Sequence, residues 1–273
     1  MKTVHINDMK VLTLDGLKYL KSICEKNNLT YYLAYGTLLG AIRHKGYIPW
    51  DDDIDIWIPR SDYFKLIEAL HQDKNDNWEV VSSNVNHDYL FEWAKLSNKK
   101  TMITPARFVS GYIYGVSIDL FPLDDVEGAK SEVEVKQLMD KIRRDYFRIT
   151  SKYRGMTNTV KSDWKLQMYK RIFKFASYVM GSYFKQIEKY NQKLKNLGNG
   201  SGDYLIGSQT PLPVIFRSEW FQKSIEVEFE GEKYNAPADY DKVLTKLYGD
   251  YMQLPPVEKR VTHHFYRAYY KDL

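Results

Sequence analysis

The acidic stretch of the segment "WDDDIDIWIP" concentrates residues that could do chemistry. It holds four aspartates within five positions: Asp51, Asp52, Asp53 and Asp55. Successive side chains of a strand point to opposite faces, so Asp53 and Asp55 should share one face while the isoleucine between them points into the core. Two carboxylates about 7 Å apart on one face repel each other unless a cation lies between them. Oxygen ligands of this kind favour Mg²⁺ or Mn²⁺ over zinc, and such ions commonly hold substrate phosphates.

A third carboxylate lies in a similar setting further along the chain. Asp119 stands between Ile118 and Leu120 in "GVSIDLFPLD", an apolar run that predicts a buried strand, where a lone acidic residue needs a partner. If this strand lies beside the one that carries Asp53 and Asp55, the three carboxylates form a metal-binding triad suited to phosphoryl transfer. The alternative is that the acidic stretch forms an ordinary polar turn and that Asp119 occupies a solvent-facing position of its strand. The small-residue "GT" turn upstream favours the metal site over this alternative. Three features then coincide: the turn, a spaced aspartate pair that opens a strand, and a third aspartate in a later strand.

The elements that must position these residues alternate between helix and strand. Leucines at helical spacing predict an amphipathic helix from about Met9 to Asn27. The segments "LTYYLAY" and "DIDIWIP" predict buried strands, and "TLLGAIRH" predicts a short helix ended by Gly46. The segment "SDYFKLIEALHQ" predicts a helix whose serine is a candidate cap.

The rest of the chain completes an α+β pattern. Strand-like segments at "WEVVSS", "FEWAKLS" and "GVSIDLF" predict a mixed β-sheet core of roughly five strands, flanked by helices. The stretch from about Lys130 to Lys195 is helical by period and composition. After "NLGNGSGD" we expect a strand near Tyr204, another at "IEVEFEG" and a helix at "YDKVLTKLYGD".

Composition excludes several classes of protein. The chain has 273 residues, of which 44% are hydrophobic and 15% aromatic, so it is long and apolar enough to bury a sizeable core. Its single cysteine, Cys24, excludes an internal disulfide and a multi-cysteine zinc site and favours a reducing, cytoplasmic setting. No secretory signal is visible at the N-terminus, and the apolar cluster Ile172–Phe184 is too short to span a bilayer.

The charge is distributed unevenly along the chain. The net charge is +5, but residues 130–195 alone hold seventeen Lys or Arg against six Asp or Glu. This basic region is interpreted either as a solvated helical face or as a surface that meets an anionic polymer or an acidic membrane leaflet. Without a phosphate-binding loop, helix-turn-helix or zinc-finger pattern, the sequence does not predict nucleic-acid binding.

Four segments resemble the LicD family of phosphotransferases, which is related to fukutin-type proteins and has a nucleotidyltransferase-like fold. They are "YGTLLGAIRHKGYIPWDDDIDI", "KLSN", "IDLFPLD" and "YGDYMQLPP". The resemblance covers about Tyr31 to Leu123 and Phe229 to His264. We expect three regions: a nucleotidyltransferase-like catalytic core with an N-terminal helix in residues 1–129, a basic helical region in 130–200, about which the resemblance says little, and a C-terminal α/β segment in 201–273 that packs back on the core.

The resemblance also implies an activity: transfer of phosphocholine, or a related phospho-alcohol such as phosphoribitol, from a CDP-activated donor to a hydroxyl of a glycan precursor such as teichoic acid or lipopolysaccharide. Gly36 and Thr37 match the family's small-residue turn near the donor phosphates. Asp53 and Asp55 match its metal-binding pair, and Asp119 its third carboxylate. The ion, Mg²⁺ or Mn²⁺, would neutralise charge on the phosphoryl group and the departing CMP, and Asp119 is also a candidate general base.

Four further residues are candidates for binding the substrate. Arg43, His44 and Lys95 adjoin the motifs and could meet phosphate oxygens, although each could equally be a surface charge or, for His44, a helix cap. Trp50 directly precedes the acidic stretch and could offer its ring to a quaternary ammonium, although most aromatic residues serve packing.

Two other functions stay open. A nucleotidyltransferase that moves a nucleoside monophosphate to a small molecule or sugar would use the same carboxylates but release pyrophosphate. A non-catalytic glycan- or membrane-binding protein would carry a degenerate site. We expect a cytoplasmic protein with peripheral contact at the anionic inner face of a membrane, because the basic region suits such a surface.

Overall fold

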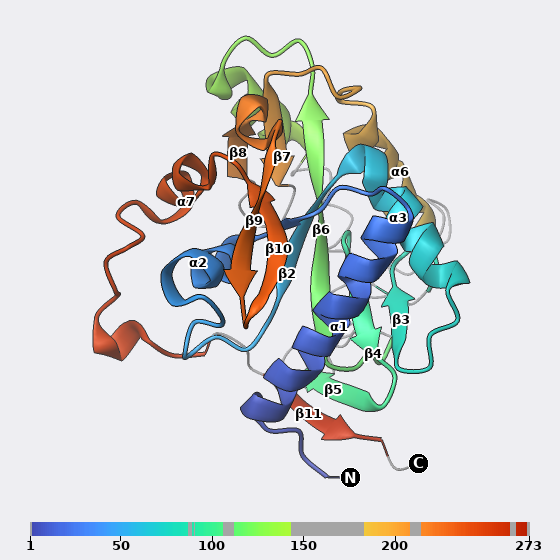
Figure 1. Ribbon diagram of the computed structural model, residues 1–273. Helices are drawn as coiled ribbons and strands as arrows, with labels where there is room; N and C mark the ends of the chain where they lie inside the picture. Colours follow the sequence, from blue (N-terminus) through green and yellow to red (C-terminus); the bar gives the residue numbers. More distant parts are fainter. Residues whose placement is uncertain are drawn as a thin grey trace, which may run out of the picture.

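The computed structural model describes residues 2–86, 89, 91–105, 112–142, 183–207, 214–262 and 266–271. Much of the basic region, residues 143–182, lies outside this part of the chain, and so does most of the apolar cluster that begins at Ile172. Figure 1 shows a twisted β-sheet at the centre of the molecule with helices packed around it. None of the helices in the described ranges combines the length and apolar character that crossing a bilayer requires.

The sheet is mixed and has seven strands, in the order β1-β2-β6-β4-β3, with β7 pairing β6 and β8 pairing β7. Its strands are β1 (Tyr32–Leu33), β2 (Asp55–Pro59), β3 (Trp78–Val81), β4 (Ala94–Asn98), β6 (Ser117–Val126), β7 (Tyr204–Gly207) and β8 (Val214–Arg217). The pair β2 and β6 is parallel and every other pair in this sheet is antiparallel. The predicted α+β class is confirmed, although the sheet is wider than the roughly five strands expected.

Strand β6 organises the sheet. Its first half lies between β2 and β4, while its second half pairs with β7, so one ten-residue strand joins the N-terminal and C-terminal parts of the sheet. In Figure 1 it is the long strand that runs through the middle of the molecule. Ile118 and Leu120 are fully buried while Asp119 between them is only partly buried, as the alternation of side chains along a strand requires.

Two helices cover one face of the sheet. Helix α1 (Ile6–Lys26) and helix α3 (Arg60–Gln72) contact each other and both contact β6. Leucines and isoleucines of both helices, such as Leu17 and Leu66, are fully buried in the main core. The predicted serine cap of α3 is wrong: Pro59 is the N-cap, so Ser61 already lies inside the first turn.

The remaining helices border the other side of the sheet and its far end. They are α2 (Tyr35–His44), residues 132–142, α6 (Tyr183–Lys195) and α7 (Tyr240–Tyr248), with short 3₁₀ helices η1 (Ser218–Phe221) and η2 (Val257–Lys259). Helix α2 ends at His44, two residues before the predicted glycine, because Lys45 takes the left-handed conformation that closes the helix. A Cβ on Gly46 would lie 2.2 Å from Glu230 Oε1, so a larger residue there would displace that carboxylate.

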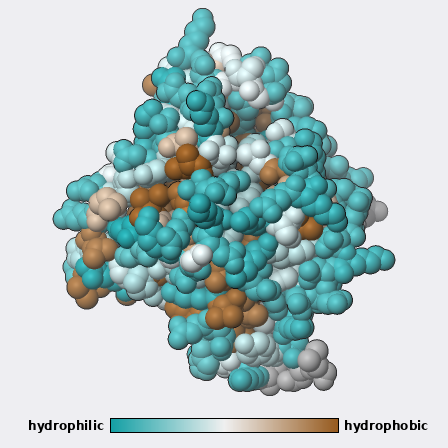
Figure 2. All heavy atoms as spheres, in the orientation of Figure 1, coloured by the Kyte–Doolittle hydropathy of each residue, from teal (hydrophilic) through white to brown (hydrophobic). Residues whose placement is uncertain are grey.

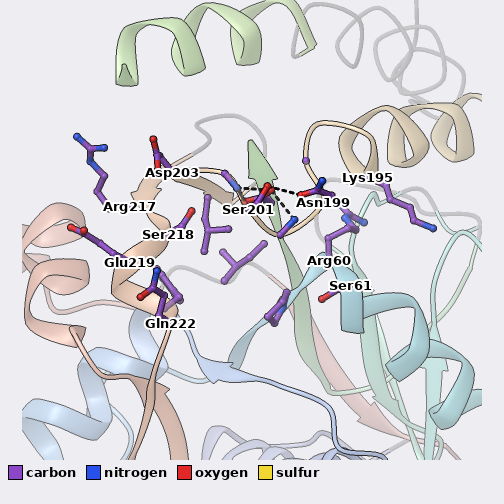
Figure 3. A pocket seen from close by; sticks show the side chains of 18 of the residues that line it. Arg60, Ser61, Lys195, Asn199, Ser201, Asp203, Arg217, Ser218, Glu219 and Gln222 are labelled. Atoms are coloured by element: carbon purple, nitrogen blue, oxygen red, sulfur yellow. Dashed lines mark hydrogen bonds between the residues drawn. The ribbon is translucent and has the colours of Figure 1, made fainter. Parts of the chain in front are cut away.

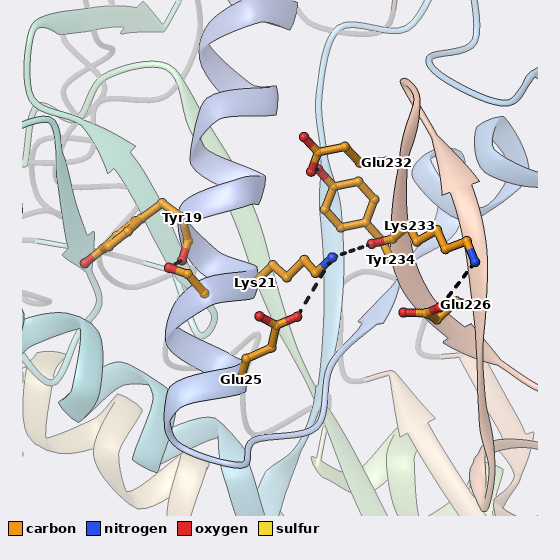
Figure 4. Close-up of polar contacts among 8 residues, drawn as sticks. Tyr19, Lys21, Glu25, Glu226, Glu232, Lys233 and Tyr234 are labelled. Atoms are coloured by element: carbon orange, nitrogen blue, oxygen red, sulfur yellow. Dashed lines mark hydrogen bonds and ion pairs between the residues drawn. The ribbon is translucent and has the colours of Figure 1, made fainter.

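Two small antiparallel pairs complete the fold: β5 (Thr101–Pro105) with β11 (Tyr266–Tyr270), and β9 (Ser224–Phe229) with β10 (Glu232–Pro237). Figure 4 shows how the β9–β10 hairpin meets α1. There the Lys21 ammonium donates to the carbonyl oxygen of Lys233 at 2.9 Å, while its ion pair with Glu25 spans 3.8 Å. Exposed contacts of this kind add little stability, so apolar burial holds the hairpin in place.

An ion pair is buried where β6 passes α3. The Arg60 guanidinium donates from Nε and Nη2 to the two carboxylate oxygens of Asp124 at 2.5 and 2.9 Å, and Asp124 is fully buried. The guanidinium also stacks on the rings of Tyr63 and Phe64. Removing one member of such a pair leaves an uncompensated charge in the core.

We therefore predict that Arg60→Met lowers the free energy of unfolding by about 3–5 kcal/mol, whereas the double change Arg60→Met with Asp124→Leu loses less. Lys246→Met is the matched control, because Lys246 pairs with Glu132 at the surface and should cost less than about 1 kcal/mol. Urea denaturation measures all three variants. Equal losses for Arg60→Met and Lys246→Met would contradict a structural role for the buried pair.

Candidate active site

Three charged residues form a row across three neighbouring strands. In the parallel pair Asp55 of β2 stands opposite Asp119 of β6, and in the antiparallel pair Asp119 stands opposite Lys95 of β4. Register partners on adjacent strands lie about 4.8 Å apart with side chains on the same face. The predicted adjacency of the two strands is confirmed, and it places the two carboxylates beside each other.

An aromatic layer borders this row on the same face of the sheet. Two residues further along each strand are Trp57 and Phe121, and the Tyr35 ring packs edge-on against both, with ring centres 4.7 and 5.8 Å apart. Trp93 packs against Phe121 in turn. These rings exclude water from one side of the carboxylates, which strengthens every electrostatic interaction in the row.

Asp55 is repelled by the carboxylates around it. Burial raises its pKa well above the usual range of an aspartate, and the nearby Asp53, Asp119 and Asp51 carboxylates raise it further, while Lys95 acts in the opposite direction. Ionised Asp55 is therefore unfavourable unless more positive charge is supplied. A divalent cation is one source of such charge.

Lys95 supplies part of the compensation. Its ammonium donates to Asp119 Oδ1, and the residue is only 8% exposed. Burial acts to lower the pKa of Lys95, but the Asp119 carboxylate, together with Tyr114 and Asp55, outweighs it, so the pKa of Lys95 is raised. Lys95 is thus a permanent cation that faces a carboxylate, instead of a free donor to solvent.

The start of α2 fits closely against the acidic stretch. The backbone N–H of Asp55 donates to Thr37 Oγ1 at 2.8 Å, so the threonine hydroxyl fixes the first residue of β2. A Cβ on Gly36 would lie 2.5 Å from Asp51 Oδ2. The predicted small-residue turn therefore lies directly against the aspartates, and only glycine leaves Asp51 its present position.

The carboxylates that lie closest together are not those of the predicted triad. Asp51, Asp52 and Asp53 each offer one carboxylate oxygen, and these atoms lie within 4.8 Å of one another. Strand β2 begins at Asp55, so Asp53 belongs to the preceding turn. Burial still alternates there, because Ile54 is fully buried between the partly buried Asp53 and Asp55, and Asp53 is the neighbouring carboxylate that raises the pKa of Asp55 most. An all-carboxylate donor set suits a hard divalent cation, so the residues present fit the Mg²⁺ or Mn²⁺ that the sequence predicted.

A cavity of about 710 Å³ opens beside this turn. Its lining includes Gly36 and Asp51 on one side, and on the other residues from the end of α7 and the segment that follows it, among them Tyr248 and Arg260. Burial, and then the Asp55, Asp51 and Asp53 carboxylates, raise the pKa of Tyr248. The Tyr248 phenol therefore lies close enough to the acidic stretch for those carboxylates to shift its pKa.

Three of the predicted binding residues lie around this cavity. Arg43 and Trp50 line it, while His44 packs its ring edge-on against Trp50. The Arg43 guanidinium donates from Nη1 to the carbonyl oxygen of Tyr251 at 2.7 Å and from Nε to His44 Nε2 at 3.0 Å. Burial, and then the neighbouring Arg43 charge, lower the pKa of His44.

Sequence reasoning missed Asp51, Tyr248 and Arg260 as site residues. Asp51 was visible in the acidic run but was passed over for the spaced pair. Tyr248 opens the "YGDYMQLPP" segment, so that motif carried the signal for it. The Arg260 guanidinium lies 5.5 Å from the centre of the Trp50 ring, and no local pattern pointed to it.

A second cavity, of about 740 Å³, lies at the other end of β2 (Figure 3). Its wall includes Arg60 and the glycine-rich loop 198–202, which Asp125 fixes by accepting the backbone N–H groups of Gly200 and Gly202 at 3.0 Å each. In Figure 3 the Arg217 and Lys195 side chains point away from its centre. The predicted site residues are not among those that line it, so it is separate from the acidic site.

Comparison with known proteins agrees with this geometry. A family model described as "LicD/FKTN/FKRP, nucleotidyltransferase domain" matches residues 28–153, which include the charged row and the start of α2. A Haemophilus influenzae protein named lipopolysaccharide cholinephosphotransferase LicD is 31% identical over 274 residues, covering 98% of this chain and 99% of that protein.

Shorter similarities occur in two uncharacterized Rickettsia proteins. One, from Rickettsia typhi, is 37% identical over 86 residues, which are 31% of this chain and 28% of that protein. The other, from Rickettsia prowazekii, is 44% identical over 73 residues, which are 26% of this chain and 27% of that protein.

The mixed sheet, the carboxylates at the start of a parallel strand pair and the matched domain define an enzyme with a nucleotidyltransferase-type catalytic domain. The class is that of phosphotransferases. The chain belongs to the LicD family.

The raised pKa of Asp55 gives a stability prediction. The folded protein binds the Asp55 proton more tightly than the unfolded chain does, so stability falls as the pH rises from the usual aspartate pKa through the raised one. Asp55→Asn removes this loss. Without divalent cations at neutral pH, its Tm should exceed that of the wild type by about 2–4 °C.

Scanning calorimetry with a chelator and then with Mg²⁺ measures the effect. Mg²⁺ should raise the Tm of the wild type more than that of Asp55→Asn, because the cation offsets the repulsion only where Asp55 is ionised. Asp76→Asn, at an exposed position away from the site, is the matched control. An unchanged Tm for Asp55→Asn, or an equal response to Mg²⁺, would show that Asp55 carries no unfavourable charge.

Proposed function

We propose that this enzyme transfers phosphocholine, or a related phospho-alcohol, from a CDP-activated donor to a hydroxyl group of a cell-surface glycan precursor such as lipopolysaccharide or teichoic acid. One observation carries the proposal: Asp55 and Asp119 stand side by side against the acidic turn, in a chain similar over nearly its whole length to a lipopolysaccharide cholinephosphotransferase. The proposed products are the phosphocholine-bearing glycan and CMP.

The carboxylates would hold the divalent cation. Asp53, Asp55 and Asp119 are the proposed ligands, with Asp51 as a further candidate because it lies within the same group of oxygens and lines the cavity. When bound, Mg²⁺ or Mn²⁺ would supply positive charge against the phosphoryl oxygens and the leaving CMP. Lys95 keeps Asp119 in place by its ion pair, so its role is to position that carboxylate.

The cavity beside Gly36 is proposed as the donor site. Because Gly36 has no side chain, the diphosphate can approach the start of α2, and Thr37 keeps β2 aligned with it. Arg260 is a cation in the cavity wall that suits phosphate oxygens, whereas Arg43 is engaged with backbone carbonyls and mainly fixes the wall.

Aromatic rings of the same cavity suit a quaternary ammonium group. Trp50 and Tyr248 both line it, and the Arg260 guanidinium already lies near the face of Trp50, which supports that ring as a site for cations. A choline headgroup over such a ring gains about 0.5–2 kcal/mol. His44 supports the edge of Trp50 and is proposed to orient it.

The transfer step needs a proton acceptor. The acceptor hydroxyl oxygen forms a bond to the phosphorus that carries choline, the bond from that phosphorus to the CMP oxygen breaks, and CMP leaves with the electron pair. Asp119 is the proposed base that takes the hydroxyl proton. We predict that Asp119→Asn lowers the turnover number at least about a hundredfold, since a base contributes about 10²–10⁴.

A steady-state assay of CMP release measures this effect, with Glu92→Gln as a control because Glu92 is a buried acid outside the charged row. A turnover number for Asp119→Asn within about tenfold of the wild type would rule out the base role.

The acceptor is proposed to lie at a membrane surface. The relative's name contains lipopolysaccharide, an amphiphile, and the basic region of this chain would be attracted to an anionic leaflet. We therefore place the enzyme in the cytoplasm with peripheral contact at the inner face of the membrane. Nucleic acid has no part in this proposal.

Nucleotidyl transfer is the second candidate, because the matched domain is a nucleotidyltransferase domain. That reaction would attack the α-phosphorus of a nucleoside triphosphate and release pyrophosphate. The two candidates therefore differ in which nucleotide the protein binds.

Calorimetric titration of CDP-choline, CDP-ribitol and CTP in the presence of Mg²⁺ tests the function. We predict Mg²⁺-dependent binding of one CDP-alcohol that is lost when Asp53→Asn and Asp55→Asn are combined. The pair Asp76→Asn with Glu68→Gln removes the same charge from exposed positions and should bind normally. Binding of CTP alone would favour nucleotidyl transfer, and no binding of any nucleotide would contradict both candidates.

A further inference from the structure

Apolar side chains gather on the segment that follows α7. Of the nine large apolar residues that are exposed in the described ranges, four lie in this short stretch: Met252, Leu254, Val257 and Val261. Val257 is 72% exposed and Met252 57%. Figure 2 shows apolar atoms at the left edge of the molecule, where Figure 1 places this segment. Contiguous exposed apolar surface of this kind marks an interaction site.

The segment is held in a defined shape. Arg43 of α2 donates to the carbonyl oxygen of Tyr251 at 2.7 Å, and the Arg260 Nε–H donates to that of Pro255 at 2.8 Å. Pro255 and Pro256 restrict the backbone further, and η2 follows them. The apolar side chains therefore project from a braced loop, and their exposure is part of the fold.

The same loop forms a wall of the proposed donor cavity. Leu254, Val257 and Lys259 line that cavity opposite Gly36 and Asp51. A partner surface that contacted the loop would consequently lie beside the opening of the cavity at the acidic site. An amphiphilic acceptor embedded in that surface would present its hydroxyl group there.

We propose that residues 252–261 form a membrane-contact loop whose apolar side chains enter the interfacial region of a lipid bilayer. The projecting residues are aliphatic, whereas the residues that dominate protein–protein interfaces are Trp, Tyr and Arg, with Leu and Val under-represented. Aliphatic side chains projecting from a firm support match insertion among lipid headgroups and acyl chains. The benefit to catalysis rests on the proposed function, but lipid binding by the loop does not.

The loop differs from the basic region in its charge. Residues 252–261 hold Glu258 against Lys259 and Arg260, a net charge of only +1, so attraction by this loop comes mainly from apolar burial. Its contribution should therefore persist at high salt, where attraction between the basic region and anionic lipid is screened.

Co-sedimentation of the full chain with sucrose-loaded vesicles tests the loop, without donor or acceptor. The vesicles contain phosphatidylcholine and phosphatidylglycerol, and binding is measured at high salt. We expect Met252→Asp combined with Val261→Asp, two exposed residues that do not line the donor cavity, to lower the partition coefficient at least about tenfold. The control is Val11→Asp with Val133→Asp, at helical positions that are 69% and 64% exposed; its partition coefficient should stay within about twofold of the wild type.

Thermal unfolding confirms that both double variants are folded. Three outcomes would overturn the proposal: no binding of the wild type at high salt, equal binding of the loop variant and the wild type, or an equal loss in the control. Because the assay contains no nucleotide, its failure is distinct from failure of the donor titration. A loop variant that binds donor normally but not vesicles would separate the two roles.

Discussion

The repulsion between Asp55 and Asp119 is the constraint around which the active-site half of the molecule is arranged. Parallel pairing of β2 and β6 brings the two carboxylates together, and the aromatic layer beside them keeps water from weakening their interaction. Lys95 on β4 compensates Asp119, while an excess of negative charge still acts on Asp55 and raises its pKa. The fold can hold this excess because the opposite face of the same strands is buried beneath α1 and α3.

The two ends of the β2–β6 pair differ in how the charges of their aspartates are compensated. Where β6 passes α3, Arg60 donates from two guanidinium nitrogens to the two carboxylate oxygens of Asp124. The negative charge of Asp124 is therefore compensated by one directly bound cation. At the start of β2, the Asp53, Asp119 and Asp51 carboxylates raise the pKa of Asp55 although Lys95 acts against them. A compensated buried pair serves structure, whereas repulsion on a buried carboxylate beside a cavity costs stability that a bound cation can return. This contrast is a physical reason to assign function to the acidic end.

The sequence predicted the features that depend on local periodicity. The alternation around Asp119 and the start of α2 near Gly36 follow from the side-chain period and small-residue pattern of short segments. It could not predict that Lys95 stands opposite Asp119, because cross-strand register depends on how distant segments pair. It also placed Asp53 in the strand, since nothing local shows that pairing with β6 begins only at Asp55.

The wall of the cavity shows why site residues far apart in the chain escape local analysis. Arg43 was chosen from the sequence as a phosphate ligand, yet its guanidinium is used to hold the backbone at Tyr251, which sets the position of the whole segment 249–261. That segment in turn brings Arg260 to Trp50 and its aliphatic residues to the surface. Arg43 therefore links helix α2, which packs against the acidic turn, to the loop that we propose contacts lipid. Contact with a membrane through this loop would act on a wall of the proposed donor cavity, because Arg43 joins α2 to the loop and the loop residues Leu254 and Val257 line that cavity.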